Sequence, residues 1–296
     1  MQKLLITGAS GFLGWYLCQI AQAEWEVYGT YHRHSVKPGV PLAASPIHWM
    51  PIDLTDLDAL KALFATVRPN AVIHAAAMSR PNDCQDDPVR SYQVNVVASC
   101  NIADLCEAAK IPCVFTSSEL VFDGTNAPYR EGDPVSPINL YGEQKVAAEL
   151  GMLDRCSQML VCRMPLMFGN VPHADSFLQP FIQRLQSGER LKVFVDEFRT
   201  PVSGEDAARG ILQLMDKVRG RIHLGGKERM SRYKFGQHLV AALHLPETML
   251  QPCRQADVPM SAPRAADVSL DSSLAFSLGY SPALVKDALV QLLGGS

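Results

Sequence analysis

Tyr141 and Lys145 stand four residues apart at the start of a segment with helical character. This spacing places the phenol and the ammonium on one face of a helix, one turn apart. A free phenol has a pKa of about 10, and a neighbouring cation lowers it toward the range in which a side chain exchanges protons at neutral pH. The pair therefore predicts acid–base chemistry, although the spacing by itself also fits an exposed surface pair.

Residues ahead of this pair strengthen the catalytic interpretation. Glu131, Pro134 and Pro137 precede Tyr141 in an E-x-x-P-x-x-P-x-x-x-Y-G-x-x-K run. Ser118 follows an apolar segment, residues 113–116, that we expect to be a strand. A hydroxyl at the carboxyl end of such a strand faces the ligand crevice of an open α/β sheet and can donate to a carbonyl oxygen on which negative charge develops. The alternative for this segment is a turn rich in serine and threonine.

Three glycines, spaced three apart, follow the first apolar segment of the chain, residues 3–7. Glycine lets the backbone turn tightly and approach a pyrophosphate, whose charge the N-terminus of the following helix stabilises. The spacing differs from the G-x-G-x-x-G fingerprint of dinucleotide-binding proteins. We expect a phosphate-binding turn, and its candidate cofactor-binding residues are Gly8, Ser10, Gly11, Phe12, Leu13 and Gly14.

Apolar segments alternate with helical patterns, which is typical of an α/β protein with a doubly wound parallel sheet of the Rossmann type. Predicted strands cover residues 3–7, 26–31, 48–52, 71–75, 113–116 and 159–164, and predicted helices cover 12–23, 56–67, 88–109 and 140–155. Later helices are expected near 176–187, 204–218 and 232–243, and later strands near 191–195 and 221–224. We therefore predict a nucleotide-binding domain at residues 1–165 and a smaller mixed substrate-binding region at 166–296, packed as one unit with a cleft between them.

The composition fits a soluble globular protein. Of the 296 residues 47% are hydrophobic, and a net charge of -3 without a dense basic cluster gives no reason to expect a nucleic-acid partner. No apolar run approaches the length of a membrane span, and the first segment does not read as a signal peptide. The eight cysteines lack paired metal-binding spacing. We expect a cytoplasmic protein with buried free thiols, no metal site and no membrane contact.

The glycine turn, the Ser118 segment and the Tyr141/Lys145 pair together resemble the extended short-chain dehydrogenases/reductases. The chain is most similar to the dTDP-4-dehydrorhamnose reductase group, whose STDxVFDG motif its TSSELVFDG sequence resembles. The resemblance implies that Ser118 is the catalytic hydroxyl and that Glu119 takes the place of the usual aspartate. It further implies that Tyr141 protonates a carbonyl oxygen. Lys145 would lower the pKa of this tyrosine and bind the nicotinamide ribose.

The same resemblance implies roles for residues of neighbouring segments. Asn95 would support the active site from a helix, and Met164 lies in the stretch expected over the nicotinamide. The remaining implied cofactor-binding residues are an adenine-binding pair, Asp53 and Leu54, and a turn of small residues, Ala75, Ala76 and Ala77. For Asp53 the alternative is a helix N-cap, which is compatible with adenine binding.

The end of the second predicted strand bears on the choice of cofactor. An enzyme specific for NAD usually places an acidic residue there for the ribose hydroxyls. This chain has His32, Arg33 and His34 instead. Arg33 can pair bidentately with a 2′-phosphate, helped by His32 or His34, so we expect NADP(H) to be preferred, with NAD(H) as the second choice. The alternative is that Arg33 is a solvated loop cation.

The substrate-binding residues implied by the resemblance are Ser118, Glu119, Arg199 and Arg264. Arg199 lies in a segment that the group places near the bound sugar, where an arginine can meet a diphosphate. Arg264 follows Pro263 in a stretch similar to the group's closing RPxxxxLD pattern. A structural role for Arg264 is equally compatible with the sequence.

The resulting hypothesis is a reductase that uses NADPH to reduce a keto group on a nucleotide-linked sugar. One alternative is a sugar-nucleotide epimerase or dehydratase. Another is a non-catalytic, NADP-binding regulatory subunit like the beta subunit of methionine adenosyltransferase, which resembles the same group. A homodimer formed through helices is common in this family and is compatible with the sequence.

Overall fold

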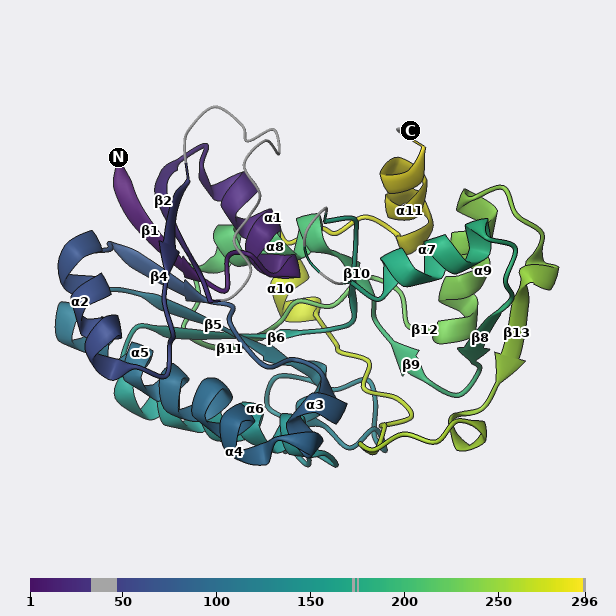
Figure 1. Ribbon diagram of the computed structural model, residues 1–296, viewed down its shortest axis with the longest axis horizontal. Helices are drawn as coiled ribbons and strands as arrows, with labels where there is room; N and C mark the ends of the chain where they lie inside the picture. Colours follow the sequence, from purple (N-terminus) through teal and green to yellow (C-terminus); the bar gives the residue numbers. More distant parts are fainter. Residues whose placement is uncertain (33–46, 172–173, 175, 295–296) are drawn as a thin grey trace.

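A seven-stranded parallel sheet forms the centre of the larger part of the molecule (Figure 1). The computed structural model describes residues 1–32, 47–171, 174 and 176–294. The strands follow the order β11-β6-β5-β4-β1-β2-β3, and the strand pairs are parallel throughout. Their bounds are β1 Gln2–Thr7, β2 Trp25–Tyr31, β3 His48–Pro51, β4 Ala71–His74, β5 Cys113–Ser118, β6 Met159–Met164 and β11 Gly220–His223. The predicted doubly wound Rossmann-type sheet is confirmed.

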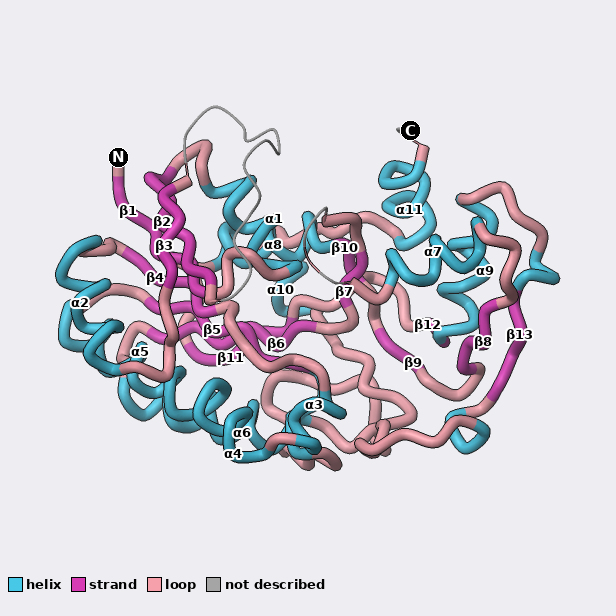
Figure 2. Tube along the Cα trace, in the orientation of Figure 1, coloured by secondary structure: helices cyan, strands magenta, loops and turns pink. Residues whose placement is uncertain are grey.

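Helices cover both faces of this sheet, which is why its inner strands read as continuous apolar runs. Figures 1 and 2 show α1 (Phe12–Ala21) and α8 (Gly204–Leu214) on one face. The other face carries α2 (Leu57–Val67), α5 (Ala98–Ala109) and α6 (Leu140–Arg155). Two hydrophobic clusters, one on each face, fill the space between sheet and helices.

Side-chain caps explain where two of these helices begin. The Asp56 carboxylate accepts hydrogen bonds from the backbone N–H groups of Asp58 and Ala59, both at 3.0 Å, and so starts α2. The Asn139 side chain accepts one from Gly142 N at 2.9 Å and starts α6. Such caps satisfy N–H groups that have no partner within the helix. The cap at Asn139 therefore fixes the helical turn that presents Tyr141.

The segment predicted as one helix over residues 88–109 is divided in three. A short helix, α4 (Pro88–Tyr92), is followed by a π-helical turn, Gln93–Val97, and then by α5. A further short helix, α3 (Pro81–Asp86), precedes α4 and escaped the sequence analysis. The π turn has a tertiary cause, because Asn95 in its middle is hydrogen-bonded to the loop that follows β4.

The smaller C-terminal region is mixed, as predicted, and contains more short strands than the sequence analysis anticipated. Its strand pairs are β10 with β7 and β13 with β8, both parallel, and β12 with β9, which is antiparallel. The elements are β7 Met167–Phe168, α7 Leu178–Gln186, β8 Leu191–Phe194, β9 Phe198–Arg199, β10 Val202–Ser203, β12 Met230–Ser231, α9 Arg232–Ala242, β13 Leu250–Cys253, α10 Ser273–Ser277 and α11 Val285–Leu293. A separate hydrophobic cluster holds α7, α9, α11, β8 and β13 together.

Elements beyond residue 165 also belong to the layers of the central sheet, and α10 is one of them, since Ala275 lies in the same hydrophobic cluster as α1 and α8. Helix α8 packs on α1, and β11 pairs with β6 as the edge strand of the central sheet. The chain thus enters the C-terminal region, returns to the sheet and leaves it again. The division at residue 165 stays a prediction, to which the structure adds these returning elements.

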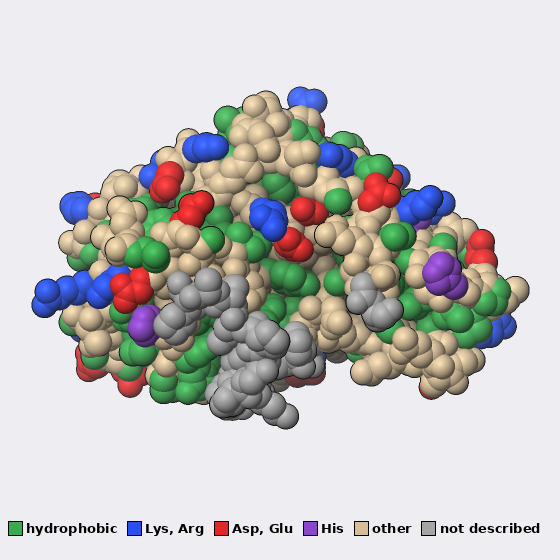
Figure 3. Space-filling view, turned by 90° about the horizontal axis from the view of Figure 1, so that it is seen from above, with side chains coloured by type: hydrophobic (Ala, Val, Ile, Leu, Met, Phe, Trp, Pro, Cys, Tyr) green, Lys and Arg blue, Asp and Glu red, His purple; other side chains and the backbone are tan. Residues whose placement is uncertain are grey.

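The surface carries charged and apolar side chains side by side, and most of the cysteines lie in the core. On the face shown in Figure 3, acidic and basic side chains are interspersed with hydrophobic ones. Within the described ranges, no helix combines the length and apolarity that crossing a bilayer requires, and no group of His, Cys, Asp and Glu side chains is arranged to hold a metal. The cysteines are free thiols, and most of them are buried.

The crowding at Gly14 provides a test of this packing. A Cβ atom there would lie 2.1 Å from the Gly8 carbonyl oxygen and 2.7 Å from Ala9 Cα, whereas one at Gly132 would meet no atom within 4 Å. We predict that Gly14→Ala lowers the free energy of unfolding by about 2 kcal/mol or more, because backbone atoms must move. Gly132→Ala should stay within about 0.5 kcal/mol of the parent protein. Urea denaturation measures both, and equal stabilities would contradict the packing.

Candidate active site

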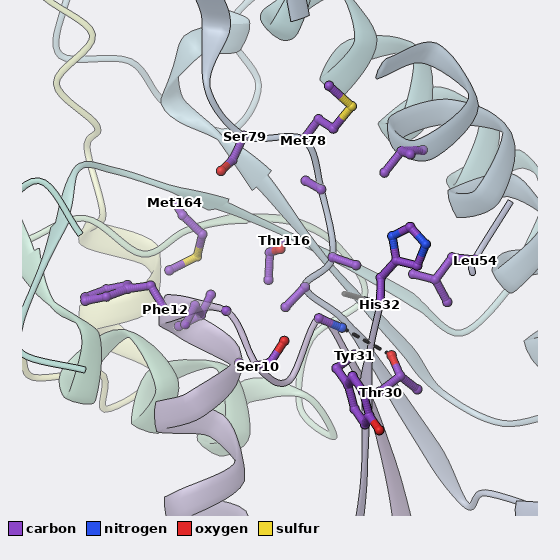
Figure 4. Close-up of a pocket in the computed structure, with 18 of the residues that line it drawn as sticks. Ser10, Phe12, Thr30, Tyr31, His32, Leu54, Met78, Ser79, Thr116 and Met164 are labelled. Atoms are coloured by element: carbon purple, nitrogen blue, oxygen red, sulfur yellow. Dashed lines mark hydrogen bonds between the residues drawn. The ribbon is translucent and has the colours of Figure 1, made fainter. Parts of the chain in front are cut away.

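A cavity of about 430 Å³ opens at the carboxyl ends of the central strands, where the strand order reverses between β1 and β4. In open α/β sheets ligands bind at this position. Figure 4 shows Phe12 and Met164 at one end of the cavity and His32 and Leu54 at the other. The lining residues are Gly8, Ser10, Gly11, Phe12, Leu13, Gly14, Thr30, Tyr31, His32, Ile52, Asp53, Leu54, Ala75, Ala76, Ala77, Met78, Ser79, Arg90, Val94, Thr116, Ser117, Tyr141, Lys145, Met164 and Met167.

The structure gathers the predicted cofactor residues around this one cavity. Each of them that falls within the described residues lines it, from the glycine turn to Tyr141, Lys145 and Met164. Arg33 and His34 lie outside the described residues. The binding roles of all these residues stay predictions, but their convergence from separate segments of the chain is a finding.

The glycine turn is shaped by close backbone approach. Gly8 has φ +68°, and a Cβ atom on it would come within 2.7 Å of Ala76 Cα. Its N–H faces the Thr30 hydroxyl at 3.4 Å (Figure 4), and Gly11 N donates to the Gly8 carbonyl oxygen at 2.9 Å. Helix α1 has no side-chain cap at Gly11. The helix N-terminus at the cavity wall therefore suits a pyrophosphate.

A polar pair lies at the His32 end of the cavity. His32 Nε2 is 3.6 Å from Asp53 Oδ2, and both side chains are about half exposed. Asp53 also accepts hydrogen bonds from the hydroxyl and the N–H of Thr55, which lower the pKa of its carboxyl. The alternative of an N-cap at Asp53 is wrong, because Asp56 caps α2. Arg90, which sequence reasoning missed, lines the cavity from α4.

Tyr141 and Ser118 meet at the catalytic end of the cavity. Ser118 ends β5, and its Oγ accepts a hydrogen bond from Leu120 N at 3.1 Å. Ser118 is also hydrogen-bonded to the Tyr141 hydroxyl. The Lys145 ammonium donates to the Thr116 carbonyl oxygen at 2.9 Å and lies 5.8 Å from the centre of the Tyr141 ring. The predicted catalytic hydroxyl, phenol and ammonium are thus brought together.

Burial dominates the protonation of this group. Burial raises the pKa of Tyr141, and the hydrogen bond to Ser118 only partly opposes this effect. Burial also lowers the pKa of Lys145 to about 8, against the opposing charge of Glu149. Desolvation therefore sets the direction of the shift at Tyr141, and the role of Lys145 in lowering the pKa of this phenol stays a prediction. The phenol keeps its proton at neutral pH.

Asn95 lies beneath the cavity wall and supports it without lining it. Its side chain accepts from Met78 N at 2.8 Å and donates to Met78 O at 3.1 Å and to Gln144 Oε1 at 2.8 Å. His74 reinforces the same region, with one ring nitrogen 2.6 Å from Thr7 Oγ1 and the other 2.9 Å from Ser99 Oγ. Sequence reasoning missed His74 and Gln144, whose partners are distant along the chain.

The predicted substrate residues other than Ser118 form ion pairs within the protein. Arg199 is 5% exposed, and its guanidinium contacts Glu119 at 3.1 Å and Glu197 at 3.4 Å. Burial raises the pKa of Glu119 to about 8, with Arg199 opposing. Arg264 is more exposed and contacts Glu197 at 3.4 Å. None of Ser118, Glu119, Arg199 and Arg264 is among the residues that line the described cavity. The contacts of Arg199 favour a structural role, so its substrate role stays a prediction.

Comparison with known families agrees with this site. A family model described as the RmlD substrate binding domain matches residues 1–293. The chain belongs to this RmlD family. The expected likeness to the dTDP-4-dehydrorhamnose reductase group is thereby confirmed.

Individual relatives of this RmlD-family chain carry different names. It is 31% identical to methionine adenosyltransferase 2 subunit beta of Rattus norvegicus, over 94% of this chain and 83% of that protein. It is 28% identical to a probable low-salt glycan biosynthesis reductase of Haloferax volcanii, over 97% of this chain and 96% of that protein. The crystal structure of dTDP-4-dehydrorhamnose reductase from Bacillus anthracis in complex with NADP superposes with a TM-score of 0.83 at 20% identity, covering 100% of both chains.

The hydrogen bonds that join Asn95 to Met78 and Gln144 can be tested by measuring the stability of variants. We predict that Asn95→Ala lowers the free energy of unfolding by about 1–3 kcal/mol, because the buried groups of Met78 and Gln144 lose their partner. Gln93→Ala is the matched control, since Gln93 is exposed on the same π turn. Urea denaturation of both variants is the measurement. Equal denaturation midpoints for the two variants would show that the hydrogen bonds of Asn95 contribute nothing to stability.

Proposed function

We propose that this protein is an NADPH-dependent reductase of a keto group on a nucleotide-linked sugar. One observation carries the proposal. Tyr141 and Lys145 line the same cavity as the glycine turn, and the Ser118 hydroxyl is bonded to the phenol at its edge. A dinucleotide bound along this cavity therefore ends beside a proton donor. Membership of the RmlD family supports the same activity.

The cavity fits a nicotinamide dinucleotide along its length. Close backbone packing at Gly8 and Gly14 sets the start of α1 at the cavity wall, where its free N–H groups suit a pyrophosphate. The adenosine would lie toward Asp53, Leu54 and the π turn, and the nicotinamide toward Met164. The related fold from Bacillus anthracis holds NADP, which supports this choice of ligand.

The roles of the protein side chains follow from their protonation and bonds. Bound NADPH supplies the hydride. Tyr141, protonated at neutral pH because burial raises its pKa, donates the proton to the carbonyl oxygen. Ser118 accepts from Leu120 N and so keeps its own O–H to donate to the same oxygen. Lys145 is held by the Thr116 carbonyl and binds the ribose hydroxyls.

The variant Tyr141→Phe tests the catalytic role. We predict that it lowers the rate of NADPH oxidation with a 4-keto sugar nucleotide about a hundredfold or more, because the proton donor is lost, while NADPH affinity changes little. Tyr92→Phe, on exposed α4, is the control and should keep the parent rate. Stopped-flow absorbance and fluorescence titration provide the two measurements. Full activity of Tyr141→Phe would overturn the role given to this phenol.

A preference for NADPH rests on the end of β2. No acidic side chain stands at Tyr31 or His32, and Arg33 follows in the sequence. We predict that NADPH raises the melting temperature more than NADH at equal concentration, since a ligand that binds the native state stabilises it. Arg33→Ser should remove most of the difference. A larger shift with NADH in the parent protein would contradict the preference.

A second candidate function is a binding subunit without turnover. The observation that favours it is the 31% identity to methionine adenosyltransferase 2 subunit beta over nearly the whole chain. Under this alternative the protein binds NADP(H) and stabilises a synthetase partner. Inactivity toward dTDP-, UDP- and GDP-linked 4-keto sugars, together with co-purification of a synthetase, would favour it over the reductase. The epimerase or dehydratase alternative predicts tightly retained NAD instead.

A further inference from the structure

A buried carboxylate, that of Glu149, lies next to residues of β5 and α6 that line the cavity. Glu149 is 1% exposed, and its oxygens accept hydrogen bonds from three side chains. Ser117 Oγ donates at 2.5 Å, Arg163 donates through Nε at 3.0 Å and Nη2 at 2.9 Å, and Arg221 Nε lies at 3.1 Å. A carboxylate with this number of charged and polar donors is fixed in position.

The partners of Glu149 are themselves held in place. The Arg163 guanidinium lies 5.0 Å from the centre of the Phe122 ring, and its Nη1 is 3.4 Å from His223 Nε2. Burial lowers the pKa of His223 to about 4, so this ring is neutral at pH 7. Burial alone would raise the pKa of Glu149, but the bonds and the charge of Arg163 hold it below its usual value. Glu149 is therefore an ionised carboxylate at neutral pH.

Glu149 connects to the catalytic group along two elements. On α6 it follows Lys145 by four residues, so the carboxylate and the ammonium share one helical face. On β5 it binds Ser117, the residue before Ser118. One side chain thus bears on the ammonium electrostatically and on the strand end through a direct bond.

Within the described part of the chain, the other groups that contact Lys145 or interact with its charge are neutral. The ammonium donates to the Thr116 carbonyl and lies 4.5 Å from the centre of the Phe115 ring, both on β5. Burial raises the pKa of the Cys84 thiol on α3 and of the Tyr141 phenol on α6, so both stay neutral. Burial lowers the pKa of His74 on β4 to about 3, so it is neutral as well.

We propose that Glu149 is a positioning residue, whose negative charge keeps Lys145 protonated at neutral pH and whose bond to Ser117 fixes the end of β5. The link to Lys145 rests on the helical spacing of the two buried side chains, and the link to β5 on the bond to Ser117. Only the use of that ammonium to hold a cofactor rests on the proposed function. Glu149 itself is not among the residues that line the cavity.

Two substitutions, one at Glu149 and one at its partner Arg221, should shift the pKa of Lys145 in opposite directions. Glu149→Gln removes the negative charge, so the pKa of Lys145 should fall by about one unit. Arg221→Gln removes a cation from Glu149 and leaves its charge less compensated, so the pKa of Lys145 should rise by a few tenths of a unit. Glu143→Gln, exposed on the same helix, is the control and should leave it unchanged. If Glu149 acted only through packing, the two pKa shifts of Lys145 would not have opposite signs.

The titration is read by NMR of protein labelled with ¹³C at the lysine ε carbon, with the Lys145 signal assigned by its loss in Lys145→Arg. If Glu149→Gln does not fold, Arg221→Gln still decides, because the Arg221 side chain is 32% exposed and tolerates replacement. Unchanged or same-direction shifts in these variants overturn the proposal. The measurement needs no cofactor, so failure to bind NADPH would refute the proposed function and leave this result standing. Where NADPH does bind, Glu149→Gln should weaken its affinity several-fold at pH 8.5 and hardly at pH 6.

Discussion

The cavity depends on how closely the turn after β1 approaches its neighbours. Gly8 comes against the backbone of Ala76, and Gly14 comes against the carbonyl of Gly8, at separations that leave no space for a side chain. These contacts set the first turn of α1 at the point where the strand order reverses. Because that turn is fixed, the helix N-terminus, the small-residue turn after β4 and the end of β5 face one common space. A bulkier residue at either glycine would separate them.

Buried ion pairs lie around the end of β5, next to the catalytic residues proposed at the cavity. Burying an ion costs free energy unless partners compensate it, and Arg163, Arg199 and Arg221 each lie against a carboxyl group. Behind β5, Glu149 faces Arg163 and Arg221; in front of it, Glu119 and Glu197 face Arg199. Ser118 lies between these two networks. The networks therefore hold the strand end from both sides, one through the central sheet and the other through the C-terminal region.

The sequence predicted the first half of the fold well for identifiable reasons. Strands β4 and β6 are buried on both faces and read as apolar runs, and the helical pattern over residues 140–155 matches α6. The π turn was not predictable, because its cause is the contact between Asn95 and Met78. Strands of two residues, such as β9, leave no periodic signal. The return of β11 to the central sheet depends on pairing with β6, which local sequence does not encode.

Site residues divide in the same way. Residues that act through the backbone or through fixed spacing, such as Gly8 or the pair of Tyr141 and Lys145, were found, since spacing is visible in the sequence. Residues whose partners are distant along the chain, such as His74 and Gln144, were missed, and the buried partners of Arg199 were not foreseen. Arg199 reads as a free cation in the sequence, yet the fold buries it against Glu119.

The protonation states also bear on the choice between the proposed reaction and its enzymatic alternative. Burial raises the pKa of Tyr141, and the pKa of Lys145 stays at about 8, so at neutral pH the phenol is protonated and most of the ammonium is too. Reduction of a keto group consumes a proton at the carbonyl oxygen, which this phenol can donate directly. An epimerase or dehydratase begins by oxidising an alcohol and needs the phenolate, whose charge the buried site disfavours. The protonated phenol is thus the state from which the proposed reduction starts, and substrate assays, not this pKa, decide between the two reactions.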